Sequence, residues 1–267
     1  MPFAKKPQVF SAKINELTLG TGDKAVTLGG QNVYNLYTFD GAYANAPKVG
    51  IDVSDSPEQP SEGLAAFYAG CETLADRAKK AASLENVDFV CIRFDLADPN
   101  GQNKSVEACV ADAKAVAEAV DKPLVVAGCK NIEKDAEIFS KVSEALQGRN
   151  ILVLSAKEEN YKGVAAGAGL AYGQKVGAES AVDINLAKQL NVLITQMGVD
   201  GHNVAMNVGS AAAGYGFEYV VSTLERVKAA ALSQNDATLQ MPIITPVGAE
   251  TWAVKESTAP ESENPGW

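Results

Sequence analysis

Polar side chains that could bind a ligand or take part in chemistry follow each of seven short apolar runs in this sequence. In a parallel barrel, such residues lie in the loops that leave the carboxyl ends of the strands, where the working face is built. In chain order they are Asp52, Asp55, Asp95, Asp98, Asn100, Cys129, Asn131, Glu158, Glu159, Asn160, Asp183, Asn185, Asn207, Ser210 and Thr245. The sequence therefore predicts one acidic, amide-rich face.

Some of these polar residues also have a structural interpretation. Asn131 and Asp183 stand directly before helical segments, so we interpret both as helix N-caps instead of ligand contacts. The segment 95–103 (DLADPNGQN) is longer than a cap requires. Contact of this segment with a ligand or a partner therefore stays open.

The cysteines and the histidine do not form a metal-binding pattern. Cys71, Cys91, Cys109 and Cys129 lie far apart, and His202 is the only histidine. Without a C-x-x-C pair, this set argues against a zinc site and against an iron–sulfur cluster carried by this chain alone. His202 lies in DGHNVA (200–205), where alanine replaces the last glycine of the D-x-H-x-x-G signature of some corrinoid modules. We predict a surface loop there.

Two further segments suggest chemistry but have simpler explanations. Lys157 could form a Schiff base if it were desolvated, yet it stands in KEEN (157–160), where charge pairing suffices. The glycines of 167–173 (GAGLAYG) have the wrong spacing for a dinucleotide loop and lie in a helical segment, where close helix packing explains them. The residues alone therefore assign no catalytic side chain and no metal ligand.

The chain that must position these residues has two parts. We predict a β-hairpin extension over residues 1–46, from the short runs Val26–Leu28 and 33–39 between glycine-rich turns. Over residues 47–267, apolar runs alternate with segments of helical period, which is typical of βαβ units. The predicted strands are 48–53, 89–94, 123–127, 151–154, 175–178, 204–208 and 242–247, and the clearest helices are 105–120, 138–146, 186–197 and 217–231.

This alternation fits either an open doubly wound sheet or a closed barrel. The length of 267 residues favours a TIM-type (β/α) barrel, since such barrels take about 250 residues. A closed barrel needs eight strands, and the sequence offers seven. We therefore expect a barrel that lacks its last βα unit in this chain.

Composition limits the partners. The formal charge of −10 would repel a phosphate backbone, so nucleic acid is not expected as a partner. No export signal follows the N-terminal lysines, and no apolar run approaches the roughly 20 residues that span a bilayer. We therefore expect a cytoplasmic protein with no membrane partner.

Several ordered motifs carry a family resemblance. The segment 95–110 (DLADPNGQNKSVEACV) is followed by 122–129 (KPLVVAGC) and 132–135 (IEKD). Together they resemble the small (delta) subunit of the corrinoid iron–sulfur protein of the acetyl-CoA decarbonylase/synthase complex. Further matching motifs lie at 159–162, 183–191, 214–219, 241–244 and 257–267. The resemblance thus covers nearly the whole chain.

This resemblance implies a barrel that pairs with a large subunit, which carries the iron–sulfur cluster. A corrinoid is shared between the two subunits. The pair would take a methyl group from a methyl-pterin methyltransferase and deliver it to acetyl-CoA synthase/CO dehydrogenase. The residues expected to face the corrinoid, as cofactor-binding and not catalytic groups, are Asp95, Asp98, Asn160, Asn185, Asn207 and Thr245.

Two points leave alternatives open. The family continues past the PGW of 265–267 with a helix, a strand and a closing helix, so we expect this chain to be truncated. A free-standing enzyme, either a pterin-binding methyltransferase-type barrel or a lyase, is a second hypothesis. A purely structural scaffold subunit that never meets the corrinoid is the third.

Overall fold

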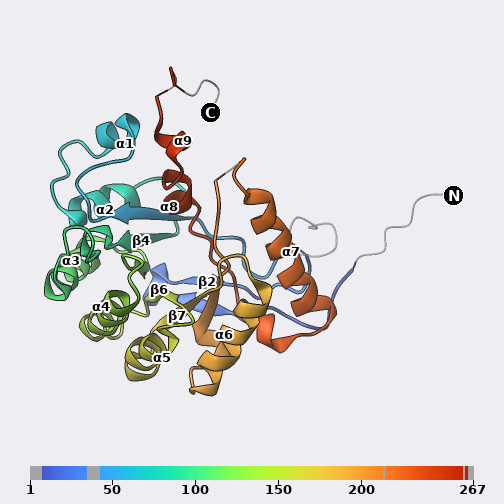
Figure 1. Ribbon diagram of the computed structural model, residues 1–267. Helices are drawn as coiled ribbons and strands as arrows, with labels where there is room; N and C mark the ends of the chain where they lie inside the picture. The colour runs from blue at the N-terminus through green and yellow to red at the C-terminus, as the bar shows by residue number, and fades with distance from the viewer. Residues whose placement is uncertain (1–7, 35–42, 213, 261, 264–267) are drawn as a thin grey trace.

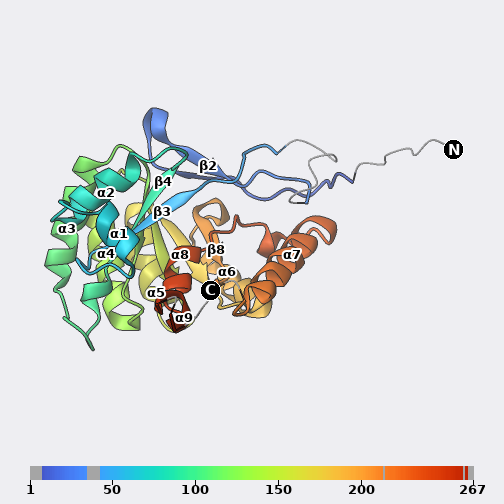
Figure 2. The same cartoon turned by 90° about the horizontal axis from the view of Figure 1, so that it is seen from above.

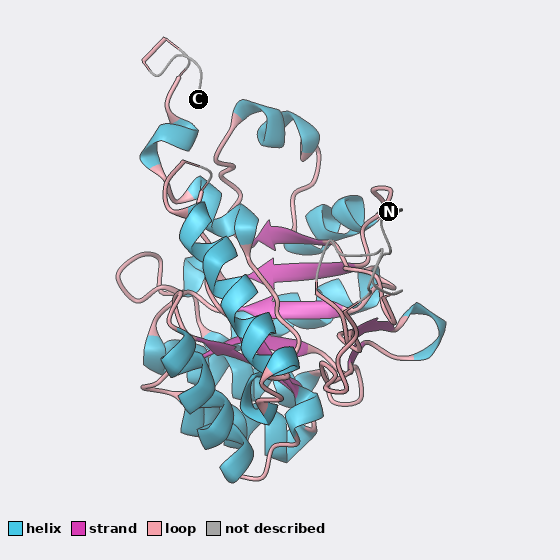
Figure 3. Cartoon of the chain, turned by 90° about the vertical axis from the view of Figure 1, so that its right-hand side faces the viewer, coloured by secondary structure: helices cyan, strands magenta, loops and turns pink. Residues whose placement is uncertain are grey.

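A computed structural model describes residues 8–34, 43–212, 214–260 and 262–263. Its centre is a six-stranded parallel sheet whose strands are neighbours in chain order, which confirms the predicted α/β class (Figures 1 and 3). The sheet strands are β3 (Gly50–Ser54), β4 (Phe89–Arg93), β5 (Leu124–Ala127), β6 (Leu152–Ala156), β7 (Lys175–Glu179) and β8 (Val204–Asn207).

Helices cover the outer side of the sheet. α2 to α6 follow one another along it, and α7 lies beside α6 and β8 (Figures 1 and 2). All four helices expected most clearly from the sequence are present, as α3, α4, α6 and α7. The helices are α1 (Glu62–Phe67), α2 (Leu74–Ala82), α3 (Val106–Ala119), α4 (Ile132–Ala145), α5 (Tyr161–Val164), α6 (Ile184–Gln196), α7 (Phe217–Ser233), α8 (Val247–Trp252) and α9 (Lys255–Thr258).

Local side-chain caps start several of these helices. The Ser105 hydroxyl accepts a hydrogen bond from Ala108 N at the start of α3, and the Asn131 side chain accepts one from Lys134 N at the start of α4. At α6, Asp183 accepts hydrogen bonds from the first backbone N–H groups. Such caps satisfy N–H groups that have no partner within the helix. The interpretation of Asn131 and Asp183 as caps is confirmed.

The N-terminal hairpin pairs differently from the prediction. β1 (Leu17–Leu19) pairs antiparallel with β2 (Val26–Leu28), whereas the sequence interpretation paired the latter run with 33–39. Of that run, residues 35–42 lie outside the described part. Leu17 and Leu19 are buried against Phe89 and Leu152, at the amino ends of the sheet strands. Burial of these two leucines makes β1 the partner of β2, and the hairpin closes the bottom of the sheet.

The last predicted strand, 242–247, is reduced to a single bridge. Met206 N donates to Pro242 O at 2.8 Å, and Ile244 N donates to Met206 O at 2.9 Å. Pro242 and Pro246 lack the N–H groups that a longer ladder needs, which limits the pairing. The segment therefore continues the sheet beyond β8 only as far as residue 244.

Candidate functional site at the carboxyl ends of the strands

The inner face of the sheet changes from apolar to polar along the strands. Side chains alternate between the two faces of a strand, so Cys91 and Arg93 of β4 share the inner face, as do Gly177 and Glu179 of β7. Cys91 belongs to the inner apolar cluster. The last inner position is polar in four strands, whereas β5 ends on Ala127. The polar positions, which form the mouth of the sheet, are Ser54, Arg93, Glu179 and Asn207.

A first polar cluster, the β3–β4 cluster, consists of Asp52, Ser54, Arg93 and Asp95. The guanidinium of Arg93 lies 2.8 Å from Asp52 Oδ2 and 3.0 Å from Asp95 Oδ2. Ser54 Oγ donates to Asp95 Oδ2 at 2.5 Å. Two carboxylates thus hold one cation at the mouth, and the arrangement fixes the guanidinium plane.

A second polar cluster, the β6–β8 cluster, consists of Ser155, Lys157, Glu179 and Asn207. Asn207 Nδ2 donates to Ser155 Oγ at 2.9 Å, where a register irregularity in β6 interrupts the alternation. Lys157 Nζ lies 3.3 Å from Glu179 Oε1. Charge pairing therefore accounts for Lys157, with Glu179 as its partner in place of the neighbouring glutamates of its own loop.

Three buried polar atoms near the carboxyl ends of the strands lack a hydrogen-bond partner within the described residues. They are Arg93 Nε, Ser180 Oγ just after β7, and Ser210 Oγ beyond β8. An unsatisfied buried polar group costs about 1–3 kcal/mol. A polar ligand that reached these atoms would remove that cost, so the mouth is suited to hydrogen bonding from outside.

Two thiols, those of Cys91 and Cys129, are poorly suited to nucleophilic attack. Burial raises the pKa of Cys91 to about 12 and that of Cys129 to about 12. The Cys129 thiol also donates to the buried carboxylate of Asp135 at 3.3 Å. Both thiols are therefore protonated at neutral pH, and the thiolate that would attack is absent.

In the structure, the six residues expected to face a ligand fall into two groups. Three of them lie at the mouth or beside it: Asp95 in the β3–β4 cluster, Asn207 in the β6–β8 cluster and Thr245 in the wall of an adjoining cavity. Asn207 is only 4% exposed, and its Oδ1 accepts from Gly209 N at 3.1 Å. The amide is thus held in one orientation.

The other three residues are engaged locally or lie outside the clusters. Asn160 Oδ1 accepts from Lys157 N at 2.8 Å, and its Nδ2 donates to Ile132 O at 3.1 Å. Asp98 Oδ1 accepts from Asn100 N within its own loop. Asn185 is exposed at the start of α6. Asn160 therefore has little hydrogen-bonding capacity left for a ligand.

Three residues of the mouth were not predicted from the sequence: Arg93, Ser155 and Glu179. A usable signal existed for two of them, because Arg93 and Glu179 are the polar residues that end an alternating inner face, two positions after Cys91 and Gly177. No comparable signal marks Ser155, since it depends on the irregularity of β6.

A glycine after β5 is required by the packing of the mouth. A Cβ added at Gly128 would lie 2.1 Å from Asp135 Oδ1, and that buried carboxylate also accepts a hydrogen bond from Cys129 N at 2.7 Å. We expect Gly128→Ala to lower the free energy of unfolding by about 1–3 kcal/mol through overpacking. Urea unfolding would measure this loss. Gly163→Ala is the control, since its Cβ would meet Ala136 Cβ at an ordinary 3.6 Å.

Within the described residues, no group of three or more histidine, cysteine, aspartate or glutamate side chains could hold a metal ion. No helix in the same part of the chain has both the length and the apolar character needed to cross a membrane.

The fold and the mouth together define a TIM-like (β/α) protein whose strand ends present a polar, hydrogen-bonding face. Residues 16–260 match the family described as the CO dehydrogenase/acetyl-CoA synthase delta subunit. The chain therefore belongs to this family, as its sequence motifs implied.

Individual relatives agree with the family assignment. The chain is 32% identical over 238 residues to the acetyl-CoA decarbonylase/synthase complex subunit delta of Methanothermobacter thermautotrophicus, covering 88% of this chain and 60% of the relative. The subunit delta of Methanopyrus kandleri is 30% identical over 239 residues, which cover 89% of this chain and 59% of the relative. The chain thus spans about three fifths of the length of these relatives.

Proposed function

We propose that this chain is the small subunit of a corrinoid methyl carrier and that its mouth helps to enclose the corrinoid. The observation that carries the proposal is the polar mouth with its two fixed polar clusters, near which three buried polar atoms lack partners among the described residues. Family membership supplies the chemical context. The curated relatives are named as subunits of a complex, and we infer that this chain also acts in a complex.

The side chains at the mouth fit the rim of a corrin. Corrin amides both donate and accept hydrogen bonds, and the mouth offers donors on Arg93 and on the serines together with acceptors on Asp95 and Glu179. When bound, the corrinoid supplies a cobalt centre that takes up and releases a methyl group. The protein side chains would orient the ring and limit the access of water.

The only histidine is not part of this site. His202 precedes β8, at the opposite end of that strand from Asn207, and its ring lies 3.3 Å from Glu16 O. We infer that any metal chemistry belongs to the corrinoid and to the large subunit, which would carry the iron–sulfur cluster. A methyl-pterin methyltransferase and acetyl-CoA synthase/CO dehydrogenase would be the donor and the acceptor of the methyl group.

A contact surface for the large subunit is expected near the mouth. Tyr219 and Val221 on α7 and Val247 at the start of α8 are large apolar side chains that remain exposed. Contiguous apolar patches on a protein surface are typical of interaction sites. We propose that they contribute to a heterodimer, which size-exclusion chromatography of the two subunits mixed at micromolar concentration would detect.

Asn207→Ala tests the proposed role of the mouth. Co-expressed with the large subunit in a host supplied with corrinoid, the variant should retain the corrinoid about fivefold less tightly. The Asn207 amide orients the Ser155 hydroxyl at the mouth, and one neutral hydrogen bond lost there costs about 1 kcal/mol. Visible spectra of the purified pair measure retention, and the rate of cobalt methylation is a second readout. Methyl transfer should weaken without vanishing.

Two control variants make this test specific. Glu133→Ala changes an exposed residue of α4 and should leave both readouts unchanged. Asn160→Ala should affect the free energy of unfolding more strongly than it affects corrinoid retention, because the Asn160 side-chain amide is hydrogen-bonded to backbone groups. Equal retention by Asn207→Ala and Glu133→Ala would favour the scaffold hypothesis. Pterin binding or turnover by the chain alone would favour the enzyme hypothesis.

A further inference from the structure

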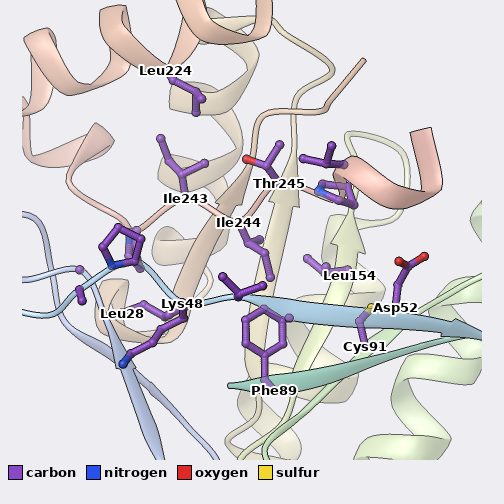
Figure 4. A pocket seen from close by; sticks show the side chains of 18 of the residues that line it. Leu28, Lys48, Asp52, Phe89, Cys91, Leu154, Leu224, Ile243, Ile244 and Thr245 are labelled. Atoms are coloured by element: carbon purple, nitrogen blue, oxygen red, sulfur yellow. The ribbon is translucent and has the colours of Figure 1, made fainter. Parts of the chain in front are cut away.

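The short helix α8 lies against the β3–β4 cluster at the mouth. Figure 4 shows it as a pale red ribbon beyond Thr245 and above Asp52. The approach is close, because a Cβ added at Gly248 would lie 2.6 Å from Asp52 Oδ1. Asp52 is held in place, since its other carboxylate oxygen lies 2.8 Å from the guanidinium of Arg93. A side chain at position 248 would therefore keep α8 away from the cluster.

Few contacts attach α8 to the rest of the protein. The helix has six residues, and none of them is buried. In the described part of the chain, its one ion pair with another element joins Glu250 Oε1 to Lys130 Nζ at 3.1 Å, and the lysine side chain is 67% exposed. Helices of this length are unstable on their own in water, and elements with few buried contacts open at a low free-energy cost. α8 is therefore suited to opening.

The contacts of this segment are made by side chains at the surface of two loops. Lys130 belongs to the loop after β5, which is fixed by a backbone hydrogen bond to the buried carboxylate of Asp135. Beyond Glu250, α9 is held to the loop after β8, where a hydrogen bond with Glu256 raises the pKa of the Tyr215 phenol. Water can solvate these charged and polar groups when the segment lifts, so opening leaves no buried group without a partner.

The closed helix lies where a ligand would cover the β3–β4 cluster. The Arg93 side chain is only 21% exposed, and its Nε is buried without a partner among the described residues. Asp52, against which α8 packs, is the ion-pair partner of the same guanidinium. A ligand large enough to cover both residues would therefore take the place of α8.

We propose that α8 is a lid on the β3–β4 cluster, held closed by the ion pair between Lys130 and Glu250, and that it opens to admit the polar rim of a large ligand to Arg93. The inference rests on the proposed function for the identity of that ligand, the corrinoid, but not for the motion. The motion begins beyond Ile244, whose N–H donates to Met206 O in the sheet. The lid lies inside residues 16–260, which match the family.

Two substitutions with different physical effects test the lid on the chain alone. Gly248→Ala favours the helix itself but places a methyl group against the cluster, so it should displace α8. Glu250→Gln keeps the side-chain length and removes the ion pair. The control for the first is Gly63→Ala in α1, another six-residue helix, where an added Cβ has its nearest neighbour at 4.0 Å. The control for the second is Glu144→Gln, which removes an exposed ion pair on α4.

Two readouts follow the position of the lid. Modification of arginine by p-hydroxyphenylglyoxal, quantified by mass spectrometry, reports the access of a small reagent to Arg93. Arg149 is exposed at the amino end of β6, far from α8 in the fold, and supplies a reference rate in the same sample. Hydrogen exchange of the amides of residues 246–254 reports directly on the helix.

Gly248→Ala should raise the modification rate of Arg93 relative to Arg149 about fivefold or more, because overpacking displaces the helix. Glu250→Gln should raise it about two- to fivefold, as expected for the loss of an exposed ion pair. Amide exchange over 246–254 should be faster in both variants, and both controls should match the unmodified chain. Unchanged modification of Arg93 in Gly248→Ala, or slower exchange there because the helix has only become more stable, overturns the proposal.

Hydroxocobalamin added to the heterodimer tests the ligand. Bound corrinoid should protect Arg93 from modification, and Gly248→Ala should take up hydroxocobalamin faster than the unmodified protein. Equal rates of uptake would overturn the role of α8 in admitting the ligand. A heterodimer that takes up no hydroxocobalamin, while both variants expose Arg93 in the chain alone, contradicts the proposed function and supports the lid.

Discussion

Lys228→Met should raise the free energy of unfolding of this chain by about 3 kcal/mol at pH 7. Burial lowers the pKa of Lys228 from 10.5 to about 8, a difference of 2.5. At about 1.36 kcal/mol for each pKa unit, this difference corresponds to about 3 kcal/mol of unfavourable desolvation in the folded, charged state. Methionine has a similar length and carries no charge, so it removes the penalty and keeps the packing.

The stability advantage of Lys228→Met over the unmodified chain must decrease as the pH rises. Because the folded-state pKa is the lower one, the unfolded chain binds more protons between about pH 8 and 10.5, and the stability of the unmodified chain rises with pH across that window. The advantage of Lys228→Met should therefore be full below pH 8 and shrink as pH approaches 10.5. Urea unfolding at pH 7 and pH 9.5 measures the difference between the two proteins, in which the titration of other groups cancels.

Arg226→Met is the control, and it should change stability by less than about 0.5 kcal/mol at both pH values, because Arg226 is exposed. An unmodified chain as stable as Lys228→Met at pH 7 would contradict the desolvation argument.

The order of the sheet could be predicted because its signals are local. Each apolar run from β3 to β8 is short and bounded by polar loops, and the helix stripes between them have the period of 3.6 residues. Caps such as Ser105 and Asn131 act on N–H groups three residues away. A parallel sheet with right-handed crossovers then follows with few choices.

Pairing between distant segments could not be predicted in the same way. Leu17-Thr18-Leu19 is too short to show a period, and its role as β1 depends on burial against Phe89, 70 or more residues away. At the other end, Pro242 and Pro246 limit a run that otherwise resembles a strand. Both cases were decided by tertiary contacts and by missing N–H groups, and not by apolar content.

The candidate site shows the same division. The sequence could place Asp95 and Asn207 at strand ends, but not the contacts Arg93–Asp52 and Asn207–Ser155, whose partners lie 41 and 52 residues apart. It also could not show that the Asn160 side-chain amide is hydrogen-bonded to Lys157 N and Ile132 O. A polar residue at a strand end can form hydrogen bonds with a ligand or with the backbone, and only the fold distinguishes these two cases.

The long segment 95–103 illustrates this choice. Its length suggested contact with a ligand or partner. In the structure it is held by Asp55, whose side chain is fully buried. Asp55 Oδ1 accepts from Leu96 N at 3.0 Å, and its Oδ2 lies 2.9 Å from Lys104 Nζ. Lys104 Nζ also forms an ion pair with Asp112 Oδ2 on α3, at 2.5 Å. The network fixes the loop against β3 and α3, and Asp95 with it.

Asp55→Ala should therefore lower the free energy of unfolding by about 3–5 kcal/mol, the usual cost of removing one partner from a buried ion pair. The variant leaves Leu96 N without its acceptor and Lys104 with Asp112 alone. Burial lowers the pKa of Lys104, but hydrogen bonds to Asp112 and Asp55 outweigh this effect and raise it above its ordinary value, so the lysine stays charged and needs both partners. Urea unfolding at pH 7 measures the loss, with Asp121→Ala as the control, because the exposed pair of Asp121 with Lys24 at 3.5 Å contributes less than about 1 kcal/mol.

A double variant identifies the origin of that loss. Adding Lys104→Met to Asp55→Ala removes the cation that the first substitution leaves with one partner, so the double variant should be more stable than Asp55→Ala alone by about 1–3 kcal/mol. The unpaired Leu96 N remains, and recovery should be incomplete. The alternative outcome is that the two losses in free energy of unfolding are additive, so that the double variant is less stable than Asp55→Ala by the full effect of Lys104→Met. In that case packing around the loop, and not the buried charge, determines the stability of the network.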